Sequence, residues 1–141
     1  MSNGMTGKLF EWEVLGPCIV TVSGYLPYLD AMALARKSQP WDPTDPETRA
    51  GSDIHASVAL ALGLDDWFEL ALYTALNSPL DLFHGVDGWF EFNGRIVTFD
   101  LTRNPTKTSS NADIIIQESE LDDLVSLGKR IAGMLLQDSS C

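Results

Sequence analysis

The sequence predicts a single α/β domain over residues 1–141, with a central mixed β-sheet flanked by helices. Residues 85–102 read as two strands joined by Asn93-Gly94, the strongest short-range signal for a β-hairpin. The apolar run over residues 112–116 is typical of a buried strand. Residues 119–136, which Ser119 can cap, carry apolar side chains at the spacing of an amphipathic helix. Helices and strands in this order indicate an α/β arrangement with mixed strand pairing.

The N-terminal part, residues 1–52, predicts a β extension, a short helix and an irregular segment. Residues 8–14 and 17–25 resemble two strands around a Gly-Pro turn, because the second is rich in β-branched residues. Apolar side chains at helical spacing predict a helix over 28–37. Prolines exclude regular structure over 39–51 and leave two interpretations: a flexible lid, or a surface segment that holds its tryptophan in the core.

Two further helices are expected before the hairpin. Asp53 can cap a helix over residues 53–62, which a glycine then ends. Asp66 and Glu69 have the spacing of a capping box, and this predicts a second helix over 66–75. The main core is therefore expected between residues 53 and 136.

Composition limits the class of protein. Hydrophobic residues make up 45% of the chain and charged residues 21%, as in ordinary globular domains. The chain lacks a run of about 18 apolar residues, so we expect no membrane span. The N-terminus lacks the basic and apolar regions of a secretory signal. The 2 cysteines do not suggest a disulfide framework, so a reducing cytoplasmic location fits best.

The charge distribution is uneven along the chain. A net charge of -11 disfavours non-specific binding of polyanions. Lysine and arginine are absent between residues 50 and 94 and return afterwards as Arg95, Arg103, Lys107, Lys129 and Arg130. Two interpretations remain open: a solvated acidic surface, or a local basic rim beside an acidic site, as a metal-using protein that binds phosphate needs.

The hairpin register brings two aspartates together. A two-residue turn places Phe92 opposite Arg95, and the same register carried outward places Asp87 opposite Asp100 in a non-hydrogen-bonded pair. The Cα atoms of such a pair lie roughly 4.5 Å apart. Like charges across a ladder destabilise it, so this pair indicates a shared proton or a bound cation such as Mg²⁺ or Mn²⁺. The structural alternatives are a bulge or turn role for Asp87 and a strand-end cap for Asp100.

This pattern resembles the PD-(D/E)XK nuclease superfamily. The residues that carry the resemblance are an acid in a helix, Gly-Val-Asp87 at one strand, Val-Thr-Phe-Asp100-Leu-Thr on its partner, and the strand and helix that follow. The resemblance covers residues 53–136 and implies a restriction-endonuclease-like core. It also implies that Asp87 is the first motif aspartate, that Asp100 is the second acid, and that Glu69 is the helical acid beside the metal.

One position departs from the family pattern. The family's lysine is expected two residues after Asp100, where this chain has Thr102. The resemblance then implies either that Lys107 folds back from the following loop to supply the amine, or that the site has lost its activity.

Together these observations predict metal-dependent phosphodiester hydrolysis by a small nuclease acting on DNA. Asp87, Asp100 and Glu69 would hold Mg²⁺ or Mn²⁺. Arg103 or Lys107 would stabilise the charge that develops on the phosphate. The alternative is a catalytically decayed nuclease-fold protein that acts as an interaction or inhibitory module, with an acidic surface that engages a basic protein.

The aromatic content predicts a homodimer. The chain has 4 tryptophans and 6 phenylalanines, and exposed aromatic patches usually mark a partner surface. Trp89 is expected on the same hairpin face as the aspartates, and Trp12 and Trp41 lie in segments without an amphipathic pattern. The resemblance agrees, since many nucleases of this superfamily are dimers. The alternative is a monomer in which the proline-rich loop covers Trp89 with Trp41.

Overall fold

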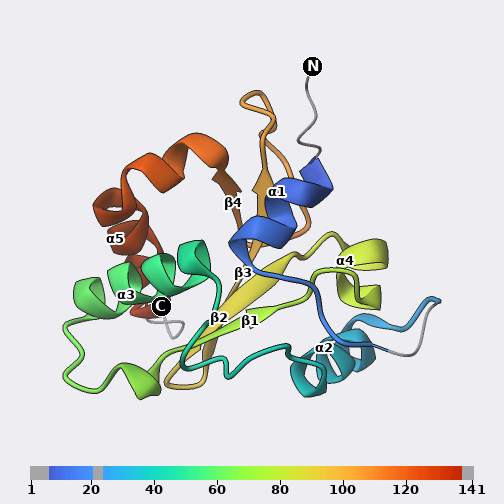
Figure 1. The fold of residues 1–141 in the computed structure, drawn as a ribbon, viewed down its shortest axis with the longest axis horizontal. Helices are drawn as coiled ribbons and strands as arrows, with labels where there is room; N and C mark the ends of the chain where they lie inside the picture. Colours follow the sequence, from blue (N-terminus) through green and yellow to red (C-terminus); the bar gives the residue numbers. More distant parts are fainter. Residues whose placement is uncertain (1–6, 21–23, 138–141) are drawn as a thin grey trace.

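The computed structural model describes residues 7–20 and 24–137 and has a single α/β domain built on a four-stranded mixed sheet (Figure 1). The strand order is β1-β2-β3-β4, with bounds Ala71–Thr74, Gly88–Phe92, Arg95–Thr102 and Ile114–Gln117. The first three strands form an antiparallel meander, and β4 pairs with β3 in parallel. The predicted fold class is therefore confirmed at this level.

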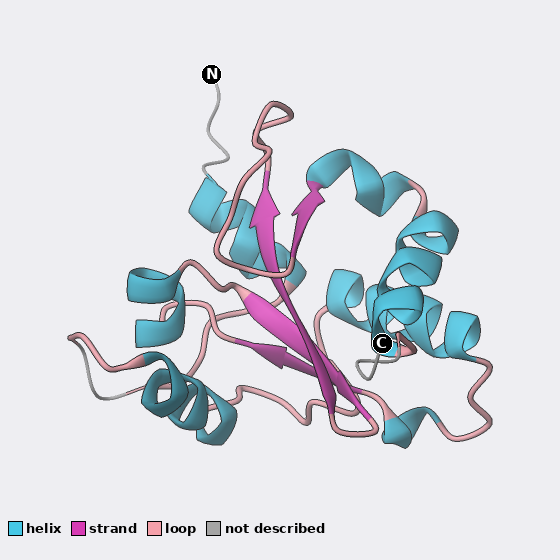
Figure 2. Cartoon of the chain, turned by 180° about the vertical axis from the view of Figure 1, so that it is seen from behind, coloured by secondary structure: helices cyan, strands magenta, loops and turns pink. Residues whose placement is uncertain are grey.

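Helices cover both faces of the sheet (Figures 1 and 2). One face carries three helices: α1 (Gly7–Val14), α3 (Arg49–Leu62) and α5 (Leu124–Leu135). These helices share a buried core with Phe90, Val97 and Phe99 of the hairpin. The other face carries α2 (Tyr28–Lys37) and α4 (Pro79–His84), which share a second core with Trp89. Side chains that alternate along the hairpin therefore point to opposite faces of the sheet, as predicted, and each face packs against its own layer of helices.

The first segment is a helix, and the predicted N-terminal β extension is wrong. Phe10 and Val14 are four residues apart, so in a helix both point into the core, where they are buried. In the predicted second strand, residues 17–20 are not part of a strand: Cys18 N–H donates to Leu76 O and Ile19 N–H to Ser38 O. Residues 21–23 of that prediction lie outside the described residues.

Helix α3 begins earlier than predicted. Thr48 is its N-cap, with a hydroxyl oxygen that accepts the N–H of Gly51, and the same hydroxyl donates to Val14 O at 2.6 Å. Asp53 therefore lies inside the helix and does not cap it. The predicted end is correct, because Gly63 terminates the helix at φ +72°.

Residues 66–75 do not form the predicted helix. A 3₁₀ turn, Trp67–Glu69, is followed by strand β1, in which Leu72 and Thr74 are fully buried and alternate with half-buried neighbours. Pairing with β2 outweighs the local helix propensity of this segment. The last helix is also shorter than predicted: a 3₁₀ turn spans Glu118–Asp122, and Asp123, rather than Ser119, caps α5.

The tryptophans are mostly internal. Trp41 is buried and its indole donates to Leu15 O at 3.1 Å, so the proline-rich segment does hold this side chain in the core. Trp89 is fully buried and stacks on Tyr73 at 4.7 Å. Trp41 and Trp89 belong to the two different cores, so one does not cover the other. Neither supplies the exposed aromatic surface on which the homodimer prediction partly depends.

The structure also bears on membrane insertion. Over the described residues, the helices are too short or too polar to cross a lipid bilayer.

Candidate carboxylate site at the start of strand β2

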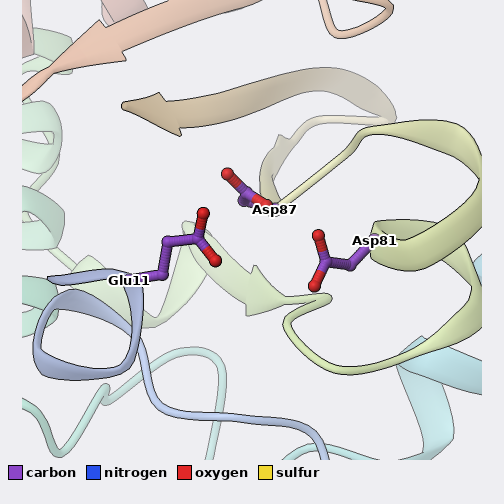
Figure 3. Close-up of side chains that lie close together, drawn as sticks. All are labelled: Glu11, Asp81 and Asp87. Carbon is purple, nitrogen blue, oxygen red and sulfur yellow. The ribbon is translucent and has the colours of Figure 1, made fainter. Parts of the chain in front are cut away.

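Three carboxylates from three elements meet beside the sheet. Glu11 lies on α1, Asp81 on α4, and Asp87 immediately before β2, and their side chains point toward one another (Figure 3). One oxygen from each lies within 4.8 Å of the others. Elements far apart in the sequence thus place three acids in one small volume.

The short helix α4 sets the position of two of these acids. Pro79 occupies its first turn, and Asp81 accepts the backbone N–H of Asn77 at 2.9 Å. Gly85 ends the helix at φ +71°, a conformation that favours glycine. This sharp turn returns the chain along the helix into β2, so that Asp87 faces Asp81.

Asp87 occupies a β-bulge. The predicted register holds from Phe92 to Gly88, which pairs with Phe99. The N–H of Asp87 also donates to Phe99 O, at 2.9 Å, so two successive residues face one partner. The regular ladder ends there, and Asp87 is not directly opposite Asp100 as predicted. Its carboxyl group instead accepts the backbone N–H of Leu101 at 2.6 Å.

The position after Asp87 has no room for a side chain, and Gly88 meets this requirement. A Cβ there would lie 2.6 Å from Tyr73 O and 2.6 Å from Phe99 Cζ. The close approach of β1 and of the Phe99 ring therefore requires a glycine next to Asp87.

The environment of Asp87 favours its protonated form. The side chain is 3% exposed, and its pKa is raised to about 10 by burial, by the hydrogen bond to Asp81 and by the charges of Glu11 and Asp81. The N–H of Leu101 acts in the opposite direction. At neutral pH Asp87 therefore holds a proton that it donates to Asp81. The sequence predicts a shared proton or a bound cation here, but with Asp100 as the partner.

The donor set fits a hard divalent cation. Mg²⁺ and Mn²⁺ prefer carboxylate oxygens, and Glu11, Asp81 and Asp87 present three such groups at a mutual spacing that one ion can bridge. The proton between Asp81 and Asp87 must leave when a cation binds, because a ligating carboxylate is deprotonated.

Asp100 pairs with the lysine that the sequence places on the following loop. Lys107 Nζ lies 2.6 Å from Asp100 Oδ2, and the Asp100 side chain is only 11% exposed. The loop folds back through a hydrogen bond from Lys107 N–H to Asn104 O and through the Gln117 amide, which donates to Lys107 O. Thr102 only supports this loop, by accepting the N–H of Asn104. The amine of Lys107 thus reaches Asp100, although the position at which the family has its lysine is Thr102.

A surface depression adjoins this ion pair. It has a volume of about 350 Å³ and is lined by Gly85, Asp100, Lys107 and residues 109–111. A neighbouring depression of about 540 Å³ shares Lys107 and extends to Arg130. The Asp100–Lys107 pair is therefore accessible from solvent at its lysine side.

Of the other predicted site residues, Glu69 lies elsewhere and Arg103 is engaged in an ion pair. Glu69 is exposed and lies just before β1, whose first residue pairs with Glu91 at the turn end of the hairpin. Asp87 lies at the opposite end of the hairpin. The structure therefore does not bring Glu69 to Asp87. Arg103 forms an ion pair with Glu118 at 3.4 Å.

Glu11 and Asp81 are the acids that the sequence reasoning missed. The strand predicted over residues 8–14 gives no reason to expect Glu11 near Asp87, whereas the helix places it there. Asp81 had a usable signal: it lies in a proline-started, glycine-ended helix only a few residues before Asp87. A helix this short, followed by a tight turn, places its acids next to the strand that it precedes.

Comparisons of the chain with protein-family models, with curated proteins and with solved structures found no match.

Proposed function

We propose that the protein is a metal-dependent phosphodiesterase of the nuclease type that acts on DNA, built on a restriction-endonuclease-like core. The observation that carries the proposal is that two groups of side chains belong to segments joined by one hydrogen bond at the start of β2. One is the carboxylate cluster Glu11–Asp81–Asp87, and the other is the Asp100–Lys107 pair. The bond from Leu101 N–H to Asp87 connects the two groups.

The arrangement of elements supports the proposal. Helix α3, the antiparallel strands β1–β3, the parallel strand β4 and helix α5 follow one another in the order that the resemblance implies, with α4 inserted between β1 and β2. Glu11 on α1 takes the place that the resemblance gave to Glu69, beside the first motif aspartate. Lys107 takes the place of the lysine missing at Thr102.

The side chains have separable tasks in this proposal. The carboxylates of Glu11, Asp81 and Asp87 would hold Mg²⁺ or Mn²⁺, and the ion would supply Lewis acidity for the hydrolysis. Asp87 gives up its proton when the ion is bound. Asp100 holds the Lys107 amine at the edge of the depression, where its positive charge stabilises the charge developing on the phosphate.

The test is cleavage of linear and supercoiled DNA with Mg²⁺ or Mn²⁺, compared among matched variants. We expect Asp100→Ala and Glu11→Gln to lower the rate by about 100-fold or more, the usual scale for loss of one electrostatic contact in a transition state. Asp122→Asn is the control and should cleave normally, because Asp122 lines a different depression from Asp100 and Lys107. No cleavage by the unmodified protein with either ion, or full activity of Asp100→Ala, contradicts the proposal.

A second candidate function is the non-catalytic module that binds a basic protein. A groove of about 800 Å³ between α1, α3 and the 3₁₀ turn before α5 favours it. Its lining combines apolar side chains with four carboxylates, one arginine and one serine: Phe10, Val14, Ala50, Leu121, Glu13, Asp53, Glu118, Asp122, Arg49 and Ser119. Such a groove is complementary to a cationic amphipathic segment.

Metal titration separates the two candidates. An ion that binds only the folded state raises the unfolding free energy by RT ln(1 + [L]/Kd). A rise in Tm with millimolar Mn²⁺ that Glu11→Gln removes supports the hydrolase. An unchanged Tm, combined with binding of a lysine-rich amphipathic peptide that Asp53→Asn weakens, supports the module instead.

A further inference from the structure

An exposed aromatic patch lies next to the candidate site. It consists of Tyr25, Tyr28, Phe83 and His84, and the first three are 65%, 40% and 48% exposed. The Tyr25 and Phe83 rings meet edge to face at 5.7 Å, and Tyr28 meets His84 at 5.6 Å. Single exposed apolar residues are normal, whereas a contiguous group marks a binding surface.

The patch is ordered by contacts between α2 and α4, which lie side by side in both views (Figures 1 and 2). The His84 ring nitrogen Nε2 lies 2.7 Å from Leu26 O, and Tyr25 packs on the same ring at 5.5 Å. The rings are therefore held in place before any ligand arrives, which lowers the entropy cost of binding.

The patch and the depression lined by Lys107 meet along the chain at residues 84 and 85. His84 is followed by Gly85, which lines that depression, and a Cβ on Gly85 would lie 3.6 Å from Asn111 Nδ2 on the opposite rim. Burial, and then the charge of Asp113, raise the pKa of Tyr28, and Asp113 lines the neighbouring depression. A ligand can thus contact the rings and the Asp100–Lys107 pair together.

The charges near this surface limit how a nucleic acid can be held. The chain carries a net charge of -11, and no lysine or arginine occurs between residues 50 and 94. Around the depressions, Lys107 is paired with Asp100, and Arg130 with Glu120 at 3.0 Å. Few phosphate contacts are therefore available, and most of the affinity has to come from the bases. Aromatic side chains supply such affinity by stacking, about 1–3 kcal/mol per base.

We propose that the aromatic patch stacks unpaired bases, so that the substrate of the site is DNA with single-stranded character. The inference rests on the proposed phosphodiester hydrolysis and names its substrate class. A duplex buries the faces of its bases against one another and offers the patch only its terminal pairs, whereas a single strand presents successive faces to Tyr25 and Phe83. The phosphates between those bases then lie toward Lys107.

The test measures binding without cleavage, in EDTA, by fluorescence anisotropy. Three labelled probes of equal length are compared: oligothymidylate, the same backbone with abasic sites, and a blunt duplex. We expect oligothymidylate to bind at least about tenfold more tightly than either of the others. Its affinity should also depend weakly on salt, with a slope of about −1, because each phosphate contact to a single strand contributes about −0.7.

Matched variants assign the effect to the patch. Tyr25→Ala and Phe83→Ala should each weaken oligothymidylate binding by roughly 5- to 100-fold, the fold-change equivalent to one stacked base. Tyr25→Phe keeps the ring and should bind normally. Phe68→Ala is the control, because Phe68 is 66% exposed but follows α3 at the far end of the sheet. Thermal unfolding of each variant verifies that it folds.

The outcomes separate this inference from the proposed function. Equal affinity for oligothymidylate and abasic DNA, or normal binding by both alanine variants, overturns the stacking proposal. The proposal also fails if the unmodified protein binds no DNA and sediments as a dimer, while Phe83→Ala sediments as a monomer. That result identifies the patch as an interface between two copies. Selective binding by a protein that never cleaves with Mn²⁺ overturns the hydrolase proposal alone. Selective binding in EDTA that is retained in Glu11→Gln, with cleavage lost, supports both.

Discussion

Asp87 donates a hydrogen bond from its protonated carboxyl group to Asp81, across the gap between the start of β2 and helix α4. The pair joins two elements, and its proton is held at neutral pH because the environment of Asp87 is buried and already negative. This proton connects the stability of the fold to the binding of a cation, because both depend on whether Asp87 is ionised.

The proton on Asp87 predicts how stability depends on pH. Its pKa is about 10 in the folded protein, against 3.8 for an ordinary aspartate, so the native state binds a proton that the unfolded chain releases. The resulting stabilisation is complete below about pH 4 and is lost as the pH rises toward 10, by at most ~1.4 kcal/mol per pH unit.

Urea unfolding of the wild type and Asp87→Asn at pH 5, 7 and 9 measures this effect. Asparagine keeps an acceptor for Leu101 N–H and a donor for Asp81, but it does not titrate. We expect the unfolding free energy of the wild type to fall relative to the variant as the pH rises. A constant difference between the two proteins across this range contradicts a raised pKa at Asp87.

Cation binding should displace the same proton. We expect Mn²⁺ to bind more tightly as the pH rises, by up to about tenfold per pH unit, with close to one proton released per ion. Calorimetry in buffers of different ionisation enthalpy counts that proton. In Asp87→Asn the ion should bind more weakly and release no proton. Release that is unchanged in the variant would assign the proton to another group.

The sequence predicts the parts of the site that depend on local rules. The Asn93-Gly94 turn fixes the hairpin register as far as Gly88, because turn geometry and strand alternation are local. The pairing of Lys107 with Asp100 also follows from a short loop. The bulge at Asp87 does not follow, because it depends on the close approach of Tyr73 O and the Phe99 ring.

The errors have a common physical cause. Residues 71–74 combine two helix formers, alanine and leucine, with the strand formers tyrosine and threonine. They form a strand because the edge of β2 offers them a ladder. Conversely, residues 7–14 form a helix because Phe10 and Val14 reach the core from one face. Both acids that the sequence reasoning missed belong to helices, and their proximity to Asp87 is created only by tertiary packing.

Gly88 should tolerate no side chain. Gly88→Ala places a methyl group 2.6 Å from the rigid Tyr73 carbonyl, so we expect a loss of about 2–4 kcal/mol of unfolding free energy, with a change at the adjacent Asp87. Gly133→Ala is the matched control. It lies in α5 with nothing within 4 Å of the new methyl group, and we expect it to stabilise by about 0.5–1 kcal/mol. Equal stability of the two variants, measured by thermal unfolding, contradicts the packing described for Gly88.

Variants of the Asp100–Lys107 pair test whether Lys107 supports only the fold or also takes part in DNA cleavage. Lys107→Met leaves the Asp100 carboxylate nearly buried without its partner, so we expect a loss of about 1–3 kcal/mol in unfolding free energy together with a loss of DNA cleavage. Adding Asp100→Asn removes the unpaired charge and should restore much of the stability. It should not restore cleavage, since the amine that stabilises the phosphate is still missing. Urea unfolding and DNA cleavage are therefore measured on the two single variants and the double variant. If the double variant recovers cleavage along with stability, the pair supports the fold only, and Lys107 has no part in the chemistry.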